Sequence, residues 1–211
     1  MDWERVKMAI IKLNNRALKD ATAVGTTTQL GNLIFISKQT ASSSSSVSFT
    51  SGIDSTYKEY IFYFNNIHAS ANAKFTFQAS TDSGSNYNTT CTSSAFGAAH
   101  NESGSFTQLS YSTGSDAAQS TSFIPISVEQ FPTDNDDSYS GYLHLFSPSD
   151  TTFVKHFISS SSYVSFSSPS KYVGNDFIAG YFNTTSAIDA IQFKMGSGNI
   201  DAGEITLFGV A

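Results

Sequence analysis

The chain has 211 residues and a formal net charge of −6, and charged residues make up only 13% of it. The length suits one large domain, or one domain with an appendage, and is enough to bury a core. Globular proteins have about 25% charged residues, and here 37 Ser and 21 Thr take the place of the missing charges. Aromatic residues at 14% argue against a disordered chain. The single cysteine, Cys91, excludes an intrachain disulfide framework and a zinc site built on several thiolates.

The N-terminal segment, residues 1–31, differs in composition from the rest of the chain. Five of the 11 basic residues lie in its first 20 positions, beside a short apolar stretch. We predict an extended anchoring arm over residues 1–31 and a single domain over residues 32–211. The run that begins at Met8 looks like a natural protein start, so the sequence leaves open whether Met1 or Met8 is the first residue. The residues expected to anchor the arm are Val6, Met8, Ile10, Ile11, Leu13 and Arg16.

After residue 31 the hydrophobic pattern has a period of two, which indicates strands. Turn-forming Gly, Ser, Asn and Asp residues separate these strands, and no helical pattern interrupts them. Many short strands with regular turns are typical of a sandwich or barrel. We therefore predict an all-β protein, a jelly-roll-like antiparallel β-sandwich with an extended N-terminal arm. The strands are expected at 32–37, 47–49, 59–67, 74–79, 90–98, 106–111, 121–128, 139–146, 152–158, 163–166, 176–182, 190–194 and 204–210.

Some of these strands carry large apolar side chains at consecutive positions, so both of their faces are apolar. The clearest case is the strand at 59–67, which contains Tyr-Ile-Phe-Tyr-Phe. A strand with two apolar faces is buried on both sides, and in a sandwich the second side is often covered by another subunit. The residues expected at a subunit interface are Tyr60, Phe62, Phe64, Tyr142, His144 and Phe146.

Charge and hydropathy exclude some partners. Residues 75–154 contain eight carboxylates and no Lys or Arg, so the domain would repel a phosphate backbone and we expect no nucleic acid. No stretch approaches the roughly 18 consecutive apolar residues of a spanning helix, so we expect no membrane insertion. The first residues lack the basic and apolar regions of a secretory signal, which predicts synthesis in a cytoplasm.

The sequence offers no strong catalytic motif, and we expect neither an enzyme nor a cofactor. It has no Gly-x-Ser-x-Gly turn, and most carboxylates lie in turns, where Asp usually caps its own backbone. Asp134, Asp136 and Asp137 are the densest group of oxygen ligands and a weak candidate for a hard cation such as calcium; a solvated acidic loop is the alternative. Exposed aromatic residues on a sandwich can also stack on sugars, and the candidates for glycan contact are Tyr87, Tyr139 and Tyr163.

Several segments resemble sequences found in tailed phages of marine bacteria, including phages of cyanobacteria. They cover most of residues 8–210: residues 8–15, 48–68, 77–87, 142–148, 180–188 and 191–209. The resemblance implies a virion structural protein and leaves open whether it is a tail fibre, a head fibre or a capsid decoration.

The resemblance and the composition together predict an oligomer on the particle exterior, made in the bacterial host cytoplasm. By analogy with fibres and decorations we expect a homotrimer, bound to other virion proteins through the arm. The alternative is a glycan-binding adhesin that recognises the surface of the host.

Overall fold

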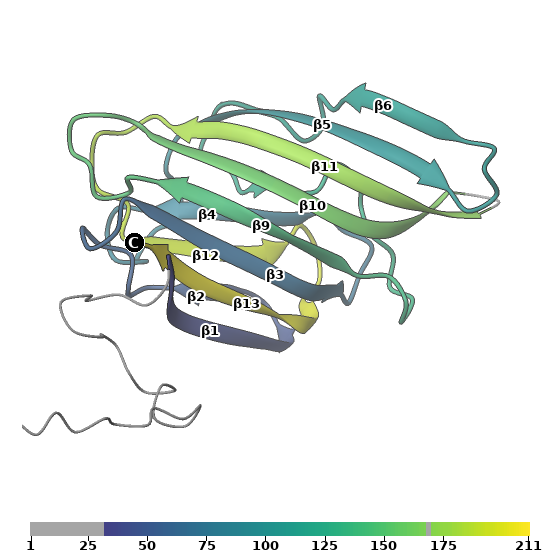
Figure 1. Ribbon diagram of the computed structural model, residues 1–211, viewed down its shortest axis with the longest axis horizontal. Coiled ribbons are helices and arrows are strands. Elements are labelled where there is room, and N and C mark those ends of the chain that lie inside the picture. The colour runs from purple at the N-terminus through teal and green to yellow at the C-terminus, as the bar shows by residue number, and fades with distance from the viewer. Residues whose placement is uncertain (1–31, 168–169) are drawn as a thin grey trace, which may run out of the picture. The chain divides into compact units, whose positions relative to one another are not determined.

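The computed structural model describes residues 32–167 and 170–211 (Figure 1). The anchoring residues predicted for the arm (Val6, Met8, Ile10, Ile11, Leu13 and Arg16) lie outside the described residues. The compact unit that contains the strands is Leu33–Ala211. Its strands are β1 (Leu33–Ser44), β2 (Val47–Phe49), β3 (Glu59–Ala69), β4 (Phe75–Ser80), β5 (Cys91–Asn101), β6 (Thr107–Tyr111), β7 (Ala117–Ser120), β8 (Ile124–Pro125), β9 (Tyr139–Phe146), β10 (Lys155–Ser167), β11 (Ser170–Phe182), β12 (Ala190–Met195) and β13 (Ile200–Val210).

The strands form two sheets, and every strand pair in them is antiparallel. The large sheet has nine strands in the order β1-β13-β3-β9-β10-β11-β5-β6, with β7 also pairing with β5. The small sheet has four strands in the order β2-β12-β4-β8. In Figure 1 the small sheet lies behind β9, β3 and β13 of the large sheet. The prediction of an all-β antiparallel sandwich is therefore confirmed.

Aromatic rings fill the space between the two sheets. Phe193 of β12 lies at the centre of this core and is fully buried. Its ring centroid is 5.2 Å from that of Phe62 and 5.2 Å from that of Phe64, both on β3 of the opposite sheet. Edge-to-face and offset pairs of this kind are favourable beyond the area that they bury. Three further rings lie within 6.3 Å of Phe193: Phe49, Phe75 and Phe77.

Strand β3 shows how the chain uses two apolar faces. Tyr60, Phe62 and Phe64 point into the core and are almost completely buried, whereas Ile61 and Tyr63 alternate with them on the other side. The prediction that Tyr60, Phe62 and Phe64 lie at a subunit interface is therefore wrong, because the small sheet already covers them. The apolar second face exists, but the residues of the opposite parity form it.

Several strands are longer than the sequence predicts. The serines at 42–44 belong to β1 and those at 159–162 belong to β10, although both runs look like loops in the sequence. In β10 the serines pair on both sides, with β9 and with β11, so the two ladders impose the extended backbone. The strands expected at 152–158 and 163–166 are therefore parts of one strand.

Candidate functional site

The side of the large sheet that faces away from the small sheet, called the outer face from here on, carries a row of large apolar side chains. Cross-strand pairing places Tyr63 beside Tyr142, and Phe177 beside Phe96, which in turn pairs with Tyr111. Because paired residues share one face of a sheet, all of these rings lie on the outer face, and Ser160 of β10 separates Tyr142 from Phe177 in the same register. This face also carries the apolar side chains of Phe35, Phe208, Phe146, Ile158 and Leu109, and the imidazole of His144.

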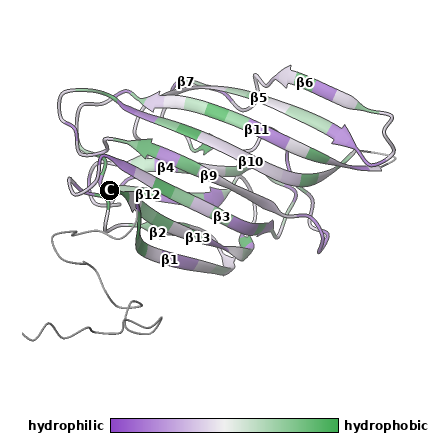
Figure 2. Cartoon of the chain, in the orientation of Figure 1, coloured by the Kyte–Doolittle hydropathy of each residue, from purple (hydrophilic) through white to green (hydrophobic). Residues whose placement is uncertain are grey.

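Many of these rings touch one another but remain open to solvent in a single chain. Phe96 and Phe177 stack with their ring centroids 5.5 Å apart and their planes 8° from parallel. Both rings are more than 40% exposed, and Leu109 at the end of the row is 75% exposed. Contiguous exposed apolar surface of this kind is rare on monomeric soluble proteins and marks an interaction site. Figure 2 shows apolar segments along β3, β9, β10 and β11 of this sheet.

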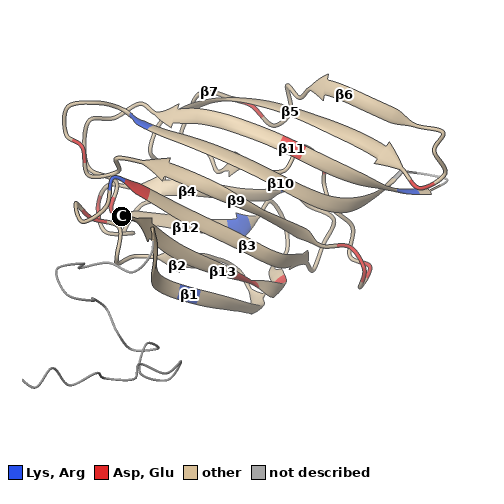
Figure 3. Cartoon of the chain, in the orientation of Figure 1, with Lys and Arg blue, Asp and Glu red and all other residues tan. Residues whose placement is uncertain are grey.

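Charged side chains are scarce on the outer face. Strands β5 and β6 contain no Lys, Arg, Asp or Glu, and Asp176 of β11 points inward. Figure 3 shows the large sheet almost free of charged positions. The exceptions lie toward β1 and the ends of the strands, where Lys38 pairs with Glu204 at 2.7 Å and Glu59 contacts His144. Depletion of charge and enrichment of aromatic residues are the features of interface cores.

The predicted interface residues of β9 do lie on the outer face. Tyr142, His144 and Phe146 are half-buried there and alternate with the core residues Leu143 and Leu145. That these three residues contact another subunit stays a prediction. The sequence does not indicate that Phe96, Tyr111 and Phe177 belong to the outer face, because their strands show no clear alternation of apolar and polar residues.

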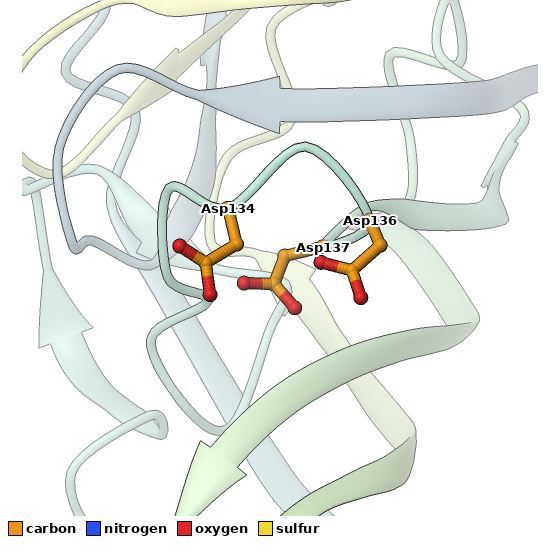
Figure 4. A group of neighbouring side chains, drawn as sticks. All are labelled: Asp134, Asp136 and Asp137. Atoms are coloured by element: carbon orange, nitrogen blue, oxygen red, sulfur yellow. The ribbon is translucent and has the colours of Figure 1, made fainter.

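The three carboxylates of the acidic loop come together, as Figure 4 shows. Their oxygens surround the ammonium group of Lys171 on β11, whose Nζ lies 2.6 Å from Asp136, 2.8 Å from Asp137 and 3.6 Å from Asp134. The hydrogen bond from Lys171 lowers the pKa of Asp136, and the two nearer carboxylates raise the pKa of Lys171. The lysine already supplies the positive charge that a metal ion would bring. This arrangement explains the cluster as an internal ion-pair network that ties the loop to β11.

Two histidines, His144 and His156, lie on the neighbouring strands β9 and β10, and each has a different partner. His144 of β9 lies opposite Ile158 of β10, and its Nδ1 contacts the Glu59 carboxylate. His156 packs against the ring of Tyr181 instead, with centroids 6.1 Å apart. Within the part of the chain that the structure describes, the one group of three potential metal ligands is the acidic loop.

A cavity of about 300 Å³ lies at the end of the large sheet, beneath β5 and β6. Asp176 lines it and is 1% exposed; one carboxylate oxygen accepts a hydrogen bond from the Val128 N–H at 2.6 Å and the other from Tyr163 at 3.4 Å. Burial raises the pKa of Asp176 to about 7. A side chain at Gly97, the residue paired with Asp176, would clash with this carboxylate. Further residues of the lining are Phe106, Gln108, Glu129, Phe166 and Tyr172.

The tyrosines predicted for glycan contact do not line an exposed edge. Tyr139 and Tyr163 are buried and stack on each other at 6.2 Å. The Tyr139 hydroxyl donates to the backbone oxygen of Ile126, and burial raises the pKa of both tyrosines. Tyr87 is half-buried, with its hydroxyl enclosed. The expected exposed glycan edge is therefore wrong for Tyr139 and Tyr163, although Tyr163 lines the cavity.

Among residues 32–167 and 170–211, no helix is long and apolar enough to cross a membrane. Comparisons with models of known protein families, with curated proteins and with solved structures gave no match to this chain.

Proposed function

We propose that the chain is a structural protein of a bacteriophage virion. In this proposal it is an oligomeric sandwich on the particle exterior, as a tail fibre, a tail-associated protein or a capsid decoration. Residues 1–31 attach it to other virion proteins. The observation that carries the proposal is the outer face, which has few charged residues and many exposed rings that neighbouring chains would bury. The phage assignment rests on the sequence resemblance.

We infer further that the sandwich is a jelly roll, a fold of two Greek keys that occurs in viral capsid and lectin domains. The support is the strand order: β1-β13-β3-β9 of the large sheet faces β2-β12-β4-β8 of the small sheet. Along the chain these eight strands alternate between the sheets, except that β4 and β8 both lie in the small sheet. The remaining strands, β5–β7 and β10–β11, extend the large sheet. A fold of this kind is compatible with a virion role and does not by itself decide it.

An aspartate on the outer face tests the proposal. The Phe177→Asp variant replaces a ring that is 42% exposed and leaves the core untouched, so the chain is expected to fold. The oligomer, for which we expect three copies, should dissociate because a buried unpaired charge at an interface is costly. Light scattering after size-exclusion chromatography at tens of micromolar measures the mass.

The matched control is Phe153→Asp, in the loop between β9 and β10, where the ring is 69% exposed. This variant should keep the mass of the unmodified chain. An unmodified chain that stays monomeric at the same concentration contradicts the proposed oligomer.

A glycan-binding adhesin is the second candidate, and the cavity beneath β5 and β6 favours it. Sugar sites combine aromatic faces with carboxylate and amide groups, and Phe106, Tyr172, Gln108 and Glu129 offer this combination here. On a glycan array, the adhesin role predicts binding that is lost at least tenfold in Phe106→Ser and kept in Phe153→Ser. Absence of binding above background by the unmodified chain contradicts the adhesin role.

A further inference from the structure

Among residues 32–167 and 170–211, strand β6 forms one edge of the large sheet, and no strand pairs with the other side of its backbone. Hydrogen bonds join Ser112 to Ala95 and Asn101 to Phe106, in the same register that pairs β6 with β5. In an antiparallel ladder the residues that bond to the neighbour alternate with residues whose N–H and C=O groups point the other way. Bonding by residues 106 and 112 therefore leaves the backbone groups of Thr107, Leu109 and Tyr111 directed at the open edge.

This edge lacks the features that usually block strand addition. Proteins protect sheet edges with short strands, Lys or Pro residues and bulges. The opposite edge of the large sheet, β1, has a bulge between Phe35 and Ser37 and carries Lys38. In the small sheet, β2 spans three residues and β8 spans two, one of them Pro125. Strand β6 has none of these features, and its sequence Thr-Gln-Leu-Ser-Tyr is uncharged.

We propose that β6 pairs with β6 of a second copy of this chain, antiparallel and across a two-fold axis at Leu109. This register pairs all five residues of the strand, sets Leu109 against its own counterpart and sets Thr107 against Tyr111. A two-fold contact uses the same surface on both partners, and an open strand edge is complementary to another open edge. The occupant is thus a second copy. Because a two-fold contact cannot close a ring of three, it would join two of the expected trimers into an assembly of six copies. The inference deepens the homo-oligomer part of the proposed function and does not depend on the virion assignment.

Charge also favours an identical partner at this place. Each chain carries a formal net charge of −6, so two copies repel each other over most approaches. Neither β5 nor β6 carries a charged residue, and the carboxylate of Asp116 near this edge accepts a hydrogen bond from Tyr111 at 2.7 Å. The pairing also covers Leu109, the most exposed of the large apolar side chains on the outer face, and joins the outer faces of the two copies into one surface.

Cysteine cross-linking of the full chain tests the register. Residues that face each other in such a pair have Cα atoms about 5.5 Å apart, within the range of a disulfide. Mild oxidation should convert Leu109→Cys into a covalent dimer, whereas Thr107→Cys and Tyr111→Cys alone should stay monomeric on denaturing gels. A mixture of Thr107→Cys and Tyr111→Cys should cross-link. The native Cys91 is buried, and its pKa is raised to about 12 by burial, so it should not react.

The outcomes separate this inference from the proposed function. If light scattering shows an oligomer but Leu109→Cys gives no covalent dimer, the β6 contact is wrong and the oligomer stands. A different segment or protein that covers β6 would also prevent the covalent dimer, and this outcome equally contradicts the β6 contact. Equal cross-linking of Thr107→Cys alone also overturns the two-fold register. A second variant, Leu109→Lys, should halve the mass by placing two like charges in contact, and an unchanged mass contradicts the contact. A monomeric unmodified chain contradicts both proposals.

Discussion

Replacing Phe193 with alanine is expected to lower the free energy of unfolding by about 3–5 kcal/mol, the usual cost of removing a buried ring. Phe193 is fully buried, and five other rings surround it within 6.3 Å. The cavity left by the missing ring cannot close easily, because the side chains around it belong to strands that are fixed by hydrogen bonds in one sheet or the other. For a domain of this size the loss corresponds to a fall in Tm of roughly 6–20 °C, measurable by calorimetry.

The matched control is Phe153→Ala, because Phe153 is 69% exposed in a loop. Removing that ring should change stability by no more than about 0.5 kcal/mol. Equal effects of the two substitutions would show that the space between the sheets is not the core of the protein.

Asp176→Asn is expected to make the protein more stable than the unmodified chain at pH 8, with little difference near pH 4. Burial raises the pKa of Asp176 to about 7 from its ordinary value of 3.8. Between these two values the folded state holds a proton that the unfolded state has released, so stability falls as the pH rises through this window. Three pKa units correspond to at most about 4 kcal/mol. Asparagine cannot ionise and can still accept the hydrogen bond from Val128.

The measurement is the difference in Tm between the variant and the unmodified chain from pH 4 to pH 8. Asp82→Asn serves as the control, because hydrogen bonds from Asn86 and Ser80 lower the pKa of Asp82 to about 2. Asp82 is then ionised in both states over most of this range, so its variant should show a nearly constant difference. A difference for Asp176→Asn that does not grow between pH 4 and pH 8 would contradict the buried, protonated carboxyl.

The sequence predicts the fold class because alternation is clear in most strands. The strand predicted at 139–146 has the observed bounds, because Leu143 and Leu145 on one face alternate with Tyr142, His144 and Phe146 on the other. Serine-rich strands were predicted too short, because the serines of β10 are held by ladders to β9 and β11 and not by their own propensity. The region at 121–128 was predicted as one strand, but only Ile124–Pro125 pairs as one.

The candidate site could be predicted only in part. The sequence indicates that the sheet has a second apolar face. Because both the even-numbered and the odd-numbered residues of β3 are apolar, their alternation does not show which set faces the core. Tyr60 and Tyr63 look equivalent in the sequence, and only the position of the small sheet separates them. Similarly, nothing local predicts that Lys171 lies among the carboxylates of the acidic loop, because β11 brings it there from a distant part of the chain.

The most direct test of the account is hydroxyl-radical footprinting of the assembled protein at tens of micromolar. The account predicts that Phe35, Phe177 and Tyr111 are oxidised several-fold more slowly than Phe153, although all four rings are at least 42% exposed in a single chain. In the dissociated Phe177→Asp chain, the two remaining rings, Phe35 and Tyr111, should become as reactive as Phe153. Oxidation of all these rings at the rate of Phe153 in the unmodified protein would contradict the claim that other chains cover the outer face.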